Sequence, residues 1–395
     1  MGKLFLQPPC CLLFVAVFLC LAGCSSLSDL KTRTSEAIFG VERLDPPEPL
    51  AIFTPTITTK IIWRAQVGVA TESDFIPAFA DAIYATGEDG DIVKLNLVQG
   101  KEVWRTHLPY ALSSGVAIGG GLVYVGNAQG EVYALDVKGK LQWKSRLSSG
   151  VLSSPQYFDG VVIVRTGDHH IYGLNANDGS RKWMYERATP PLILRSSAGV
   201  AVDGGAIYAG FAGGTLVALR ADNGKLLWET PVAQPRGVTE IERITDITSL
   251  PVVEGDSVYT VAYQGKVSAI ERLTGRIIWS RDISSLAGLD VRHGQVFITQ
   301  SDSLLYALES SSGKTFWRQA LLKNRRLTTP LALDRWLVLG DLEGYLHIIN
   351  SEDGTLAARL QIDDSAVLPH LVAIADNTFI AQTRKGSLVA VKVGE

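Results

Sequence analysis

The sequence is poor in cysteine, in methionine and in net charge. Its four cysteines all lie at or before Cys24, and none occurs in the rest of the 395 residues. Disulfides and cysteine-ligated metal sites are therefore excluded from everything that follows Cys24. Lys and Arg total 37 against 40 Asp and Glu, so the dense basic face that a general nucleic-acid binder needs is missing. Two methionines beside 38 glycines argue against a helical bundle and favour a turn-rich β protein.

Residues 1–23 have the features of a secretory signal peptide. Lys3 is their only charge, and the apolar run Cys10–Ala22 is too short to span a hydrocarbon core of about 30 Å. The run leads into Leu-Ala-Gly-Cys24, which resembles the lipobox of bacterial lipoproteins. This resemblance implies cleavage before Cys24 and acylation of its thiol. Because Ser25 rather than Asp follows, it also implies an outer-membrane location with the chain on the periplasmic face. The alternative is an ordinary signal peptide with an incidental cysteine.

One pattern recurs along the rest of the chain. It consists of Gly, an apolar stretch ending in Ala-Leu, a polar turn with Gly, and a strand ending in Trp, as in GEVYALDVKGKLQW from Gly130 to Trp143. Its tryptophans recur about every 40 residues. They are Trp63, Trp104, Trp143, Trp183, Trp228, Trp279 and Trp317. This period, with its hairpin patterning, predicts four-stranded propeller blades in which most Trp side chains cover the gaps between neighbouring blades.

The repeats predict eight blades that close by a strand swap. The seventh copy, Gly344–Ala358, has lost its Trp, and the eighth stops at the C-terminus before its last strand. Lys60–Arg64 has the sequence of an outer strand without a preceding partner, so we expect it to complete the blade begun by Leu371–Val393. Closure would remove two sheet edges that could otherwise pair with other chains. The predicted fold is an all-β, eight-bladed β-propeller over residues 60–395, monomeric as a propeller.

The segment between the signal peptide and the propeller lacks the repeat. It holds four prolines, polar residues and only scattered apolar ones. We therefore expect residues 24–59 to form a lipidated, flexible tether without a core of its own. The predicted organisation is a signal peptide over 1–23, this tether, and the propeller over 60–395.

The sequence carries no motif of a catalytic or metal site. It has no G-x-S-x-G elbow, H-E-x-x-H helix or Walker-type loop. His169-His170 falls in a turn of the repeat, where solvated side chains are expected rather than metal ligands. Asp89 and Asp91 resemble a fragment of a Ca²⁺ loop, but turn chemistry explains them. We expect no enzyme activity, no cofactor and no metal.

Function on a repeat scaffold is expected where the repeat is broken, because insertions form loops on one face. One interruption, Glu186–Arg195, has the sequence ERATPPLILR and replaces a short serine-rich link. The other, Thr230–Ile247, lengthens the interval between two tryptophans and mixes charged residues with isoleucines. Apolar residues beside arginine and acidic groups are typical of protein interfaces. The alternative is that Leu192 and Leu194 are buried in the channel mouth, but the proline pair and charged flanks favour an outward position.

Together, the lipobox, tether, repeats and two interrupted links resemble the BamB family, lipoprotein subunits of the outer-membrane β-barrel assembly (Bam) machinery. The resemblance implies a non-catalytic scaffold that binds the periplasmic POTRA domains of BamA and aids folding and insertion of outer-membrane proteins. The family's BamA contacts fall on Leu192, Leu194, Arg195 and Asp246. Thr248 stands where the family has a second acidic residue. Unfolded outer-membrane proteins are a further partner that the resemblance raises.

Two other functions fit part of the pattern. The repeat also resembles pyrroloquinoline-quinone dehydrogenases, which carry a Ca²⁺–quinone site, often beside a vicinal disulfide. Here the only vicinal cysteines, Cys10 and Cys11, lie in the signal peptide. The remaining alternative is an envelope lipoprotein propeller that binds another partner, such as peptidoglycan.

Overall fold

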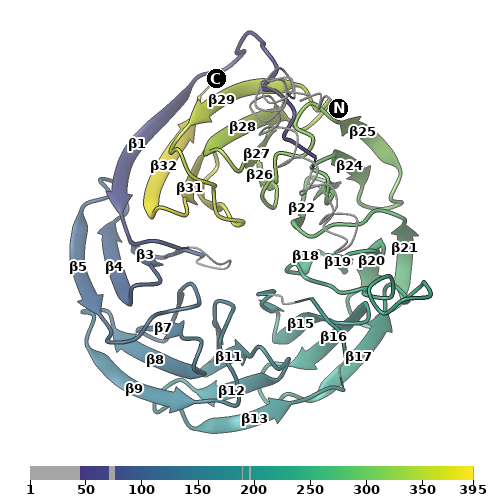
Figure 1. The fold of residues 1–395 in the computed structure, drawn as a ribbon. Coiled ribbons are helices and arrows are strands. Elements are labelled where there is room, and N and C mark those ends of the chain that lie inside the picture. The colour runs from purple at the N-terminus through teal and green to yellow at the C-terminus, as the bar shows by residue number, and fades with distance from the viewer. Residues whose placement is uncertain (1–44, 71–75, 189, 195–196, 395) are drawn as a thin grey trace, which may run out of the picture. The chain divides into compact units, whose positions relative to one another are not determined.

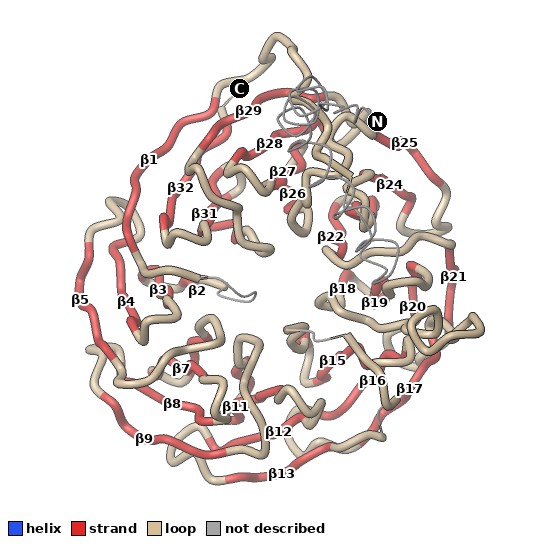
Figure 2. The backbone as a smooth tube through the Cα atoms, in the orientation of Figure 1, coloured by secondary structure: helices blue, strands red, loops and turns tan. Residues whose placement is uncertain are grey.

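The computed structural model describes residues 45–70, 76–188, 190–194 and 197–394. The predicted signal peptide, Cys24 and most of the expected tether therefore lie outside the described residues. Chain contacts separate Met1–Pro46 from a compact unit over Pro47–Glu395. Every regular element described in this unit is a β-strand (Figure 2). None of the described segments is a helix with the length and apolarity needed to cross a membrane.

Eight four-stranded sheets stand around a ring in the unit Pro47–Glu395, with the last strand of each blade on the circumference (Figure 1). Blades 1 and 2 contain β2 (Ala78–Phe79), β3 (Ala82–Thr86), β4 (Asp91–Asn96) and β5 (Glu102–His107), then β6 (Ala117–Gly119), β7 (Leu122–Gly126), β8 (Glu131–Asp136) and β9 (Leu141–Arg146). Blades 3 and 4 contain β10 (Gln156–Phe158), β11 (Val161–Arg165), β12 (Ile171–Asn175) and β13 (Arg181–Tyr185), then β14 (Ala201–Asp203), β15 (Ala206–Phe211), β16 (Thr215–Arg220) and β17 (Leu226–Pro231).

The other half of the ring repeats this arrangement. Blades 5 and 6 contain β18 (Val252–Glu254), β19 (Ser257–Val261), β20 (Val267–Glu271) and β21 (Ile277–Arg281), then β22 (Gly288–Arg292), β23 (Gln295–Thr299), β24 (Leu305–Glu309) and β25 (Thr315–Gln319). Blades 7 and 8 contain β26 (Leu331–Leu333), β27 (Trp336–Gly340), β28 (Tyr345–Asn350) and β29 (Leu356–Gln361), then β30 (Val372–Ala375), β31 (Thr378–Gln382), β32 (Ser387–Val393) and β1 (Thr59–Gln66).

The predicted strand swap is confirmed. β1 pairs antiparallel with β32, from Thr59 opposite Val393 to Gln66 opposite Ser387, and completes the sheet β1-β32-β31-β30. The eight-bladed fold closed by an N-terminal strand is therefore the one that the repeats predict. Its physical role is to give β32 a hydrogen-bonding partner along its whole length, so that the last blade is completed and the ring closes.

Local sequence explains the strands of each blade. Inner strands such as β11 are buried at every position and apolar up to their last residue, whereas outer strands such as β9 are mostly exposed and bury their Trp. Tight turns join them. Between β10 and β11, Asp159 and Gly160 have φ values of 41° and 77°. Two positive φ values are what a type I′ turn requires, as the Asp-Gly pair predicts.

The tryptophans pack between blades as predicted. The Trp143 indole N–H donates to the carbonyl of Ala176 in the next blade at 2.8 Å. Its ring lies so close over Gly179 that a Cβ there would come within 2.5 Å of it. The same pairing of an indole with a turn glycine of the following blade occurs for Trp63 with Gly100, Trp104 with Gly139, Trp183 with Gly224, Trp228 with Gly275, Trp279 with Gly313 and Trp317 with Gly354. The repeat glycine and the repeat tryptophan thus form one inter-blade contact.

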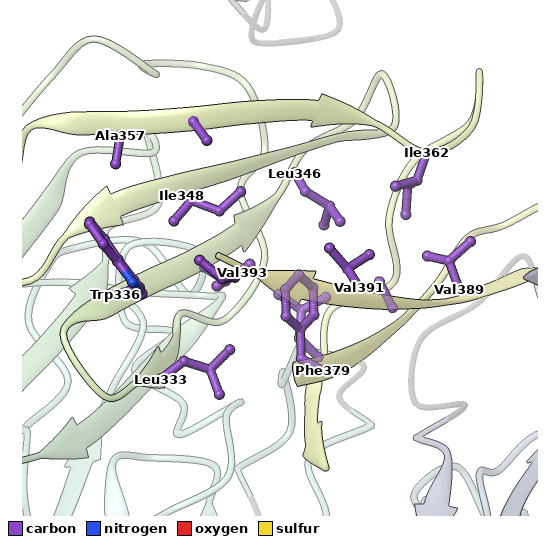
Figure 3. Packing of buried hydrophobic residues seen from close by; sticks show 14 of the residues in the cluster. Leu333, Trp336, Leu346, Ile348, Ala357, Ile362, Phe379, Val389, Val391 and Val393 are labelled. Carbon is purple, nitrogen blue, oxygen red and sulfur yellow. The ribbon is translucent and has the colours of Figure 1, made fainter. Parts of the chain in front are cut away.

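The seam between blades 7 and 8 is built differently, because Ala358 stands at the Trp position of the repeat. Residues 47–58, which we call the strap, run beside this seam before entering β1. Ile57 from the strap joins Ala358 and Val393 in the buried cluster between the two blades. Figure 3 shows the side chains of both blades that form it. An apolar side chain from the strap and Trp336 of β27 thus pack in the seam that lacks the repeat tryptophan.

The strap alters the expected boundary of the tether. The Glu48 N–H donates to the Lys323 carbonyl at 3.1 Å, and the Thr56 N–H donates to the Ala357 carbonyl at 2.9 Å. The segment predicted as free tether over 24–59 therefore docks on blade 7 in its last part, and the compact unit begins at Pro47 rather than at residue 60. Strap carbonyls also accept from the propeller: that of Glu48 from Arg325 at 2.9 Å and that of Ala51 from Arg359 at 3.0 Å.

Candidate functional site

The two interruptions of the repeat form consecutive inter-blade links. Residues 186–200, the first link, connect β13 of blade 3 to β14 of blade 4. Residues 232–251, the second link, connect β17 of blade 4 to β18 of blade 5. The equivalent link between blades 2 and 3 is only residues 147–155. Both long links therefore lie at the two ends of blade 4.

The first link presents its apolar tip to solvent. Pro190, Pro191 and Leu192 are exposed, and the Leu192 side chain retains 42% of its accessible surface. Leu194 is half-buried, and Arg195 lies outside the described residues. Leu192 is thus exposed rather than buried, whereas Leu194 two residues later is partly covered.

Asp246 does not occupy the exposed position expected of a residue that contacts a partner. It is 4% exposed. Its carboxylate accepts the Leu194 N–H at 2.7 Å and the Gly213 N–H at 3.0 Å. Its own carbonyl accepts the Tyr263 N–H of blade 5 at 2.8 Å. The structure therefore brings together Leu194 and Asp246 as predicted, but through backbone hydrogen bonds within the chain.

A buried aromatic and cationic cluster lies beneath the first link. Arg165, at the end of β11, donates to the Ala198 carbonyl at 3.0 Å and lies 5.0 Å from the Phe211 ring centre. On the other side of the link, Arg187 lies 6.0 Å from the same ring and 3.5 Å from the Glu229 carboxylate. Burial lowers the pKa of Arg165 to about 10, so it remains protonated at neutral pH. Burial is the only cause of this pKa shift, and no carboxylate among the described residues offsets it.

His169 belongs to this cluster, and the expectation of two solvated histidines is wrong for it. It occupies the turn position of Gly130 in a left-handed conformation, with φ 65°, and is 6% exposed. The Arg165 guanidinium approaches its Nδ1 at 3.0 Å. Burial and the neighbouring Arg165 charge lower the pKa of His169. Since a guanidinium only donates, this nitrogen must be the unprotonated one.

His170 lies in a polar group that resembles a catalytic arrangement only in composition. Its Nδ1 is 3.1 Å from Asp168 and 3.3 Å from the Ser148 hydroxyl, and its Nε2 is 3.7 Å from Glu186. Nucleophilic catalysis requires the serine and the carboxylate on opposite ring nitrogens. Here Asp168 meets the same nitrogen as Ser148, and the Ser148 hydroxyl donates to Asp168 at 2.6 Å rather than to the ring. Glu186, on the opposite nitrogen, lies at 3.7 Å, beyond hydrogen-bond distance. In the described part of the chain, no group of three or more His, Cys, Asp or Glu is placed to hold a metal ion.

The second link is stiffened by its own side chains. The Glu242 carboxylate accepts the N–H groups of Val238 and Thr239 at 2.8 and 3.1 Å, and the Thr239 hydroxyl accepts the Glu242 N–H at 3.2 Å. This reciprocal capping leaves Val238 and Ile241 exposed at 95% and 69%. Thr248, at the position of the expected second acid, is half-buried.

Sequence reasoning missed Arg165 and Phe211. A signal was available in the repeat, because the last residue of the second strand of a blade is Thr86 in blade 1 and Thr299 in blade 6, whereas blade 3 ends this apolar strand with an arginine. A charged residue in that position indicates a local partner that the other blades lack. The position of Phe211 beneath both arginines has no comparable signal, since an aromatic residue in a buried strand is ordinary packing.

Known proteins match this chain along nearly its whole length. The family model described as outer membrane protein assembly factor BamB matches residues 88–319 and 301–395. A protein of that name from Nitrosomonas eutropha is 39% identical over 382 residues, covering 95% of this chain and 93% of the relative. The crystal structure of BamB from Moraxella catarrhalis has a TM-score of 0.77 and 25% identity, covering 85% of this chain and 100% of that one.

The dehydrogenase likeness extends to the fold alone. A quinohemoprotein alcohol dehydrogenase from Pseudomonas putida HK5 has a TM-score of 0.68 but 14% identity, covering 85% of this chain and 76% of that enzyme. Such a likeness reports a shared arrangement of blades and carries no chemistry. The family model and the identity to relatives, by contrast, cover the repeats and both long links, and they show that the chain belongs to the BamB family of outer membrane protein assembly factors.

Proposed function

We propose that the chain is a non-catalytic subunit of the outer-membrane β-barrel assembly complex that binds the POTRA domains of BamA through its first link. The observation that carries this proposal is the exposed tip of Pro190, Pro191 and Leu192. The backbone that follows the tip is hydrogen-bonded to Asp246 at Leu194 and to Arg165 at Ala198. An apolar anchor presented by a fixed backbone is what a tight, specific contact needs. The relatives' name, outer membrane protein assembly factor, supports the same role.

The contact rests on side chains more than on strand pairing. An extended segment can add to the edge of a partner sheet only where its N–H groups are free. Pro190 and Pro191 have none, and that of Leu194 is bonded to Asp246. From Pro190 to Leu194, only Leu192 and Ile193 have an N–H that could bond to a partner strand. Two donors are too few for a paired strand, so we infer that Leu192 acts as an apolar anchor in a pocket of the partner.

The same proposal includes a lipid anchor at Cys24 on the periplasmic face of the outer membrane. Residues 24–46 then form the free tether, with a root-mean-square reach of roughly 25–30 Å. Several acyl chains together hold a protein far more firmly than one. Replacing Cys24→Ala should release the chain into the soluble or unprocessed fraction, and its persistence in the outer membrane of cells that lack BamA would contradict the anchor.

Copurification tests the proposed partner. The tethered chain is captured from detergent-solubilised membranes, and the proteins that accompany it are identified, for the wild type and for a variant carrying Leu192→Ala, Leu194→Ala and Arg195→Ala. We expect BamA with the wild type and at least a tenfold loss with the variant. Capture of a different envelope partner without BamA, or equal capture of BamA by a folded variant, would overturn the proposal.

A further inference from the structure

Asp246 connects three parts of the molecule that meet at the end of blade 4. Its carboxylate accepts N–H groups from the first link, at Leu194, and from the β15–β16 turn, at Gly213. Its backbone carbonyl accepts Tyr263 from the β19–β20 turn of blade 5. With 4% exposure, the side chain has almost no surface left for another molecule.

A carboxylate is well suited to this position. Each of its oxygens takes one N–H, so both bonds form at once and both are strengthened by the negative charge. An asparagine there retains a single acceptor oxygen, and an alanine retains none. Because a buried N–H without an acceptor is unfavourable, loss of the carboxylate should move the Leu194 backbone toward water.

Asp246 acts together with two other attachments of the first link. Arg165 binds the Ala198 carbonyl, and Arg187 is held by Glu229 and the Phe211 ring. Between these attachments, the described residues Ala188, Pro190, Pro191 and Leu192 are exposed. The link is therefore fixed near both ends and in its middle, at Leu194, while it presents Leu192.

We infer that Asp246 is a positioning residue for partner binding, which acts by fixing the Leu194 backbone and makes no contact with the partner itself. The inference rests on the proposed function for the identity of the partner. A link that is already ordered binds without first selecting a rare conformation, and the apparent affinity falls in proportion to the fraction of molecules in the binding-competent conformation.

Hydrogen exchange of the free protein tests the structural half of this inference without any partner. Deuterium uptake of the peptide covering residues 190–198 is compared between the wild type, Asp246→Asn and Asp246→Ala, with a peptide from β11 as the control for global folding. We expect uptake in the first link to rise about tenfold for alanine, less for asparagine, and not at all in β11. Unchanged uptake in Asp246→Ala would overturn the inference whatever the partner proves to be.

A double-mutant cycle tests the functional half. Affinity for the purified POTRA domains of BamA is measured for Asp246→Ala, Leu194→Ala and the double variant. If Asp246 acts through Leu194, the double variant loses clearly less affinity than the product of the two single losses. Losses that multiply, with normal exchange in the first link, would show that Asp246 contacts the partner directly and would refute the inference. Absence of POTRA binding by the wild type would refute the proposed function alone, since the exchange result stands apart from it.

Discussion

Two arginines in this propeller are buried to a similar degree, yet they differ in whether a counter-charge lies beside them. Arg325, on the link between blades 6 and 7, is 2% exposed and donates to the Glu48 carbonyl of the strap at 2.9 Å. Arg165, in blade 3, is 5% exposed and donates to the Ala198 carbonyl of the first link at 3.0 Å. Each guanidinium thus holds a segment that lies outside the blades.

The difference lies in the counter-charges. Arg325 is bonded to the buried carboxylate of Asp341 at 2.8 Å and also to Glu343. Burial alone would lower its pKa, but the hydrogen bonds to Glu343 and Asp341 raise the pKa of Arg325 above its usual value. Arg165 has no such partner among the described residues, and burial lowers its pKa. The strap is therefore attached by a neutralised network, whereas the first link rests on a charge that the blade itself does not compensate.

The comparison predicts its largest effect at Arg325. Replacing Arg325→Met leaves Asp341 buried without its cation, so the free energy of unfolding should fall by about 3–5 kcal/mol. Denaturant unfolding measures this loss. The exposed neighbour Arg326 is the matched control, and Arg326→Met should change the stability by less than about 0.5 kcal/mol. A loss at Arg325 no larger than the loss at Arg326 would break the comparison.

Arg165 should respond much less in stability. Arg165→Met exchanges an uncompensated buried charge for an apolar side chain of similar length, so the cost should be about 1 kcal/mol or less. Amide exchange in the first link should nevertheless increase, because the Ala198 carbonyl loses this donor. Equal destabilisation at Arg165 and Arg325 would mean that counter-charge does not distinguish the two sites.

The smallest expected effect is on the pH dependence of stability, through His169 beside Arg165. Burial, then the charge of Arg165, lowers the pKa of His169, and the nearby Asp246 and Asp168 only partly oppose this. The folded state therefore binds a proton at His169 less readily than the unfolded state does. The contribution of His169 to the free energy of unfolding is fully present above about pH 6.5 and is lost as the pH falls below that value. His169→Asn preserves the left-handed turn and should reduce the slope of stability against pH between 6.5 and 5.

The slope should not vanish in that variant, because a second buried histidine contributes. Burial lowers the pKa of His347, which lies 3.0 Å from Asp341 and is fully buried in blade 7. Unfolding midpoints measured across this pH range for the wild type, His169→Asn and His347→Gln separate the two contributions. A pH profile unchanged by His169→Asn would show that Arg165 and His169 are not coupled in the way that their geometry indicates.

Much of the fold could be predicted because its determinants are local and repeated. The tryptophans and turn glycines recur once in most blades. The strand at Trp63 has no preceding partner in sequence, and closure by β1 follows from this. Docking of the strap could not be predicted in this way. Its contacts join Glu48 to Arg325 across 277 positions of the chain, and a backbone carbonyl carries no information about its donor.

In the candidate site, too, local features could be predicted from the sequence and contacts between distant segments could not. The exposed tip at Leu192 follows from two adjacent prolines and an apolar run, all within one link. The burial of Asp246 and His169 does not, because it depends on how turns of blades 3, 4 and 5 meet. Both are polar residues in loops, so the resemblance placed Asp246 in a partner contact and the turn position placed His169 in solvent.

Affinity for the purified POTRA domains of BamA tests the central claim most directly, when titrated against three folded chains. These are the wild type, the variant with Leu192→Ala and Leu194→Ala, and Arg325→Met, measured at a temperature where all three are native. The account predicts at least a tenfold loss for the leucine variant and none for Arg325→Met, because the first link binds the partner and the strap does not. Wild-type affinity in a folded leucine variant, or weakened binding by folded Arg325→Met, would contradict it.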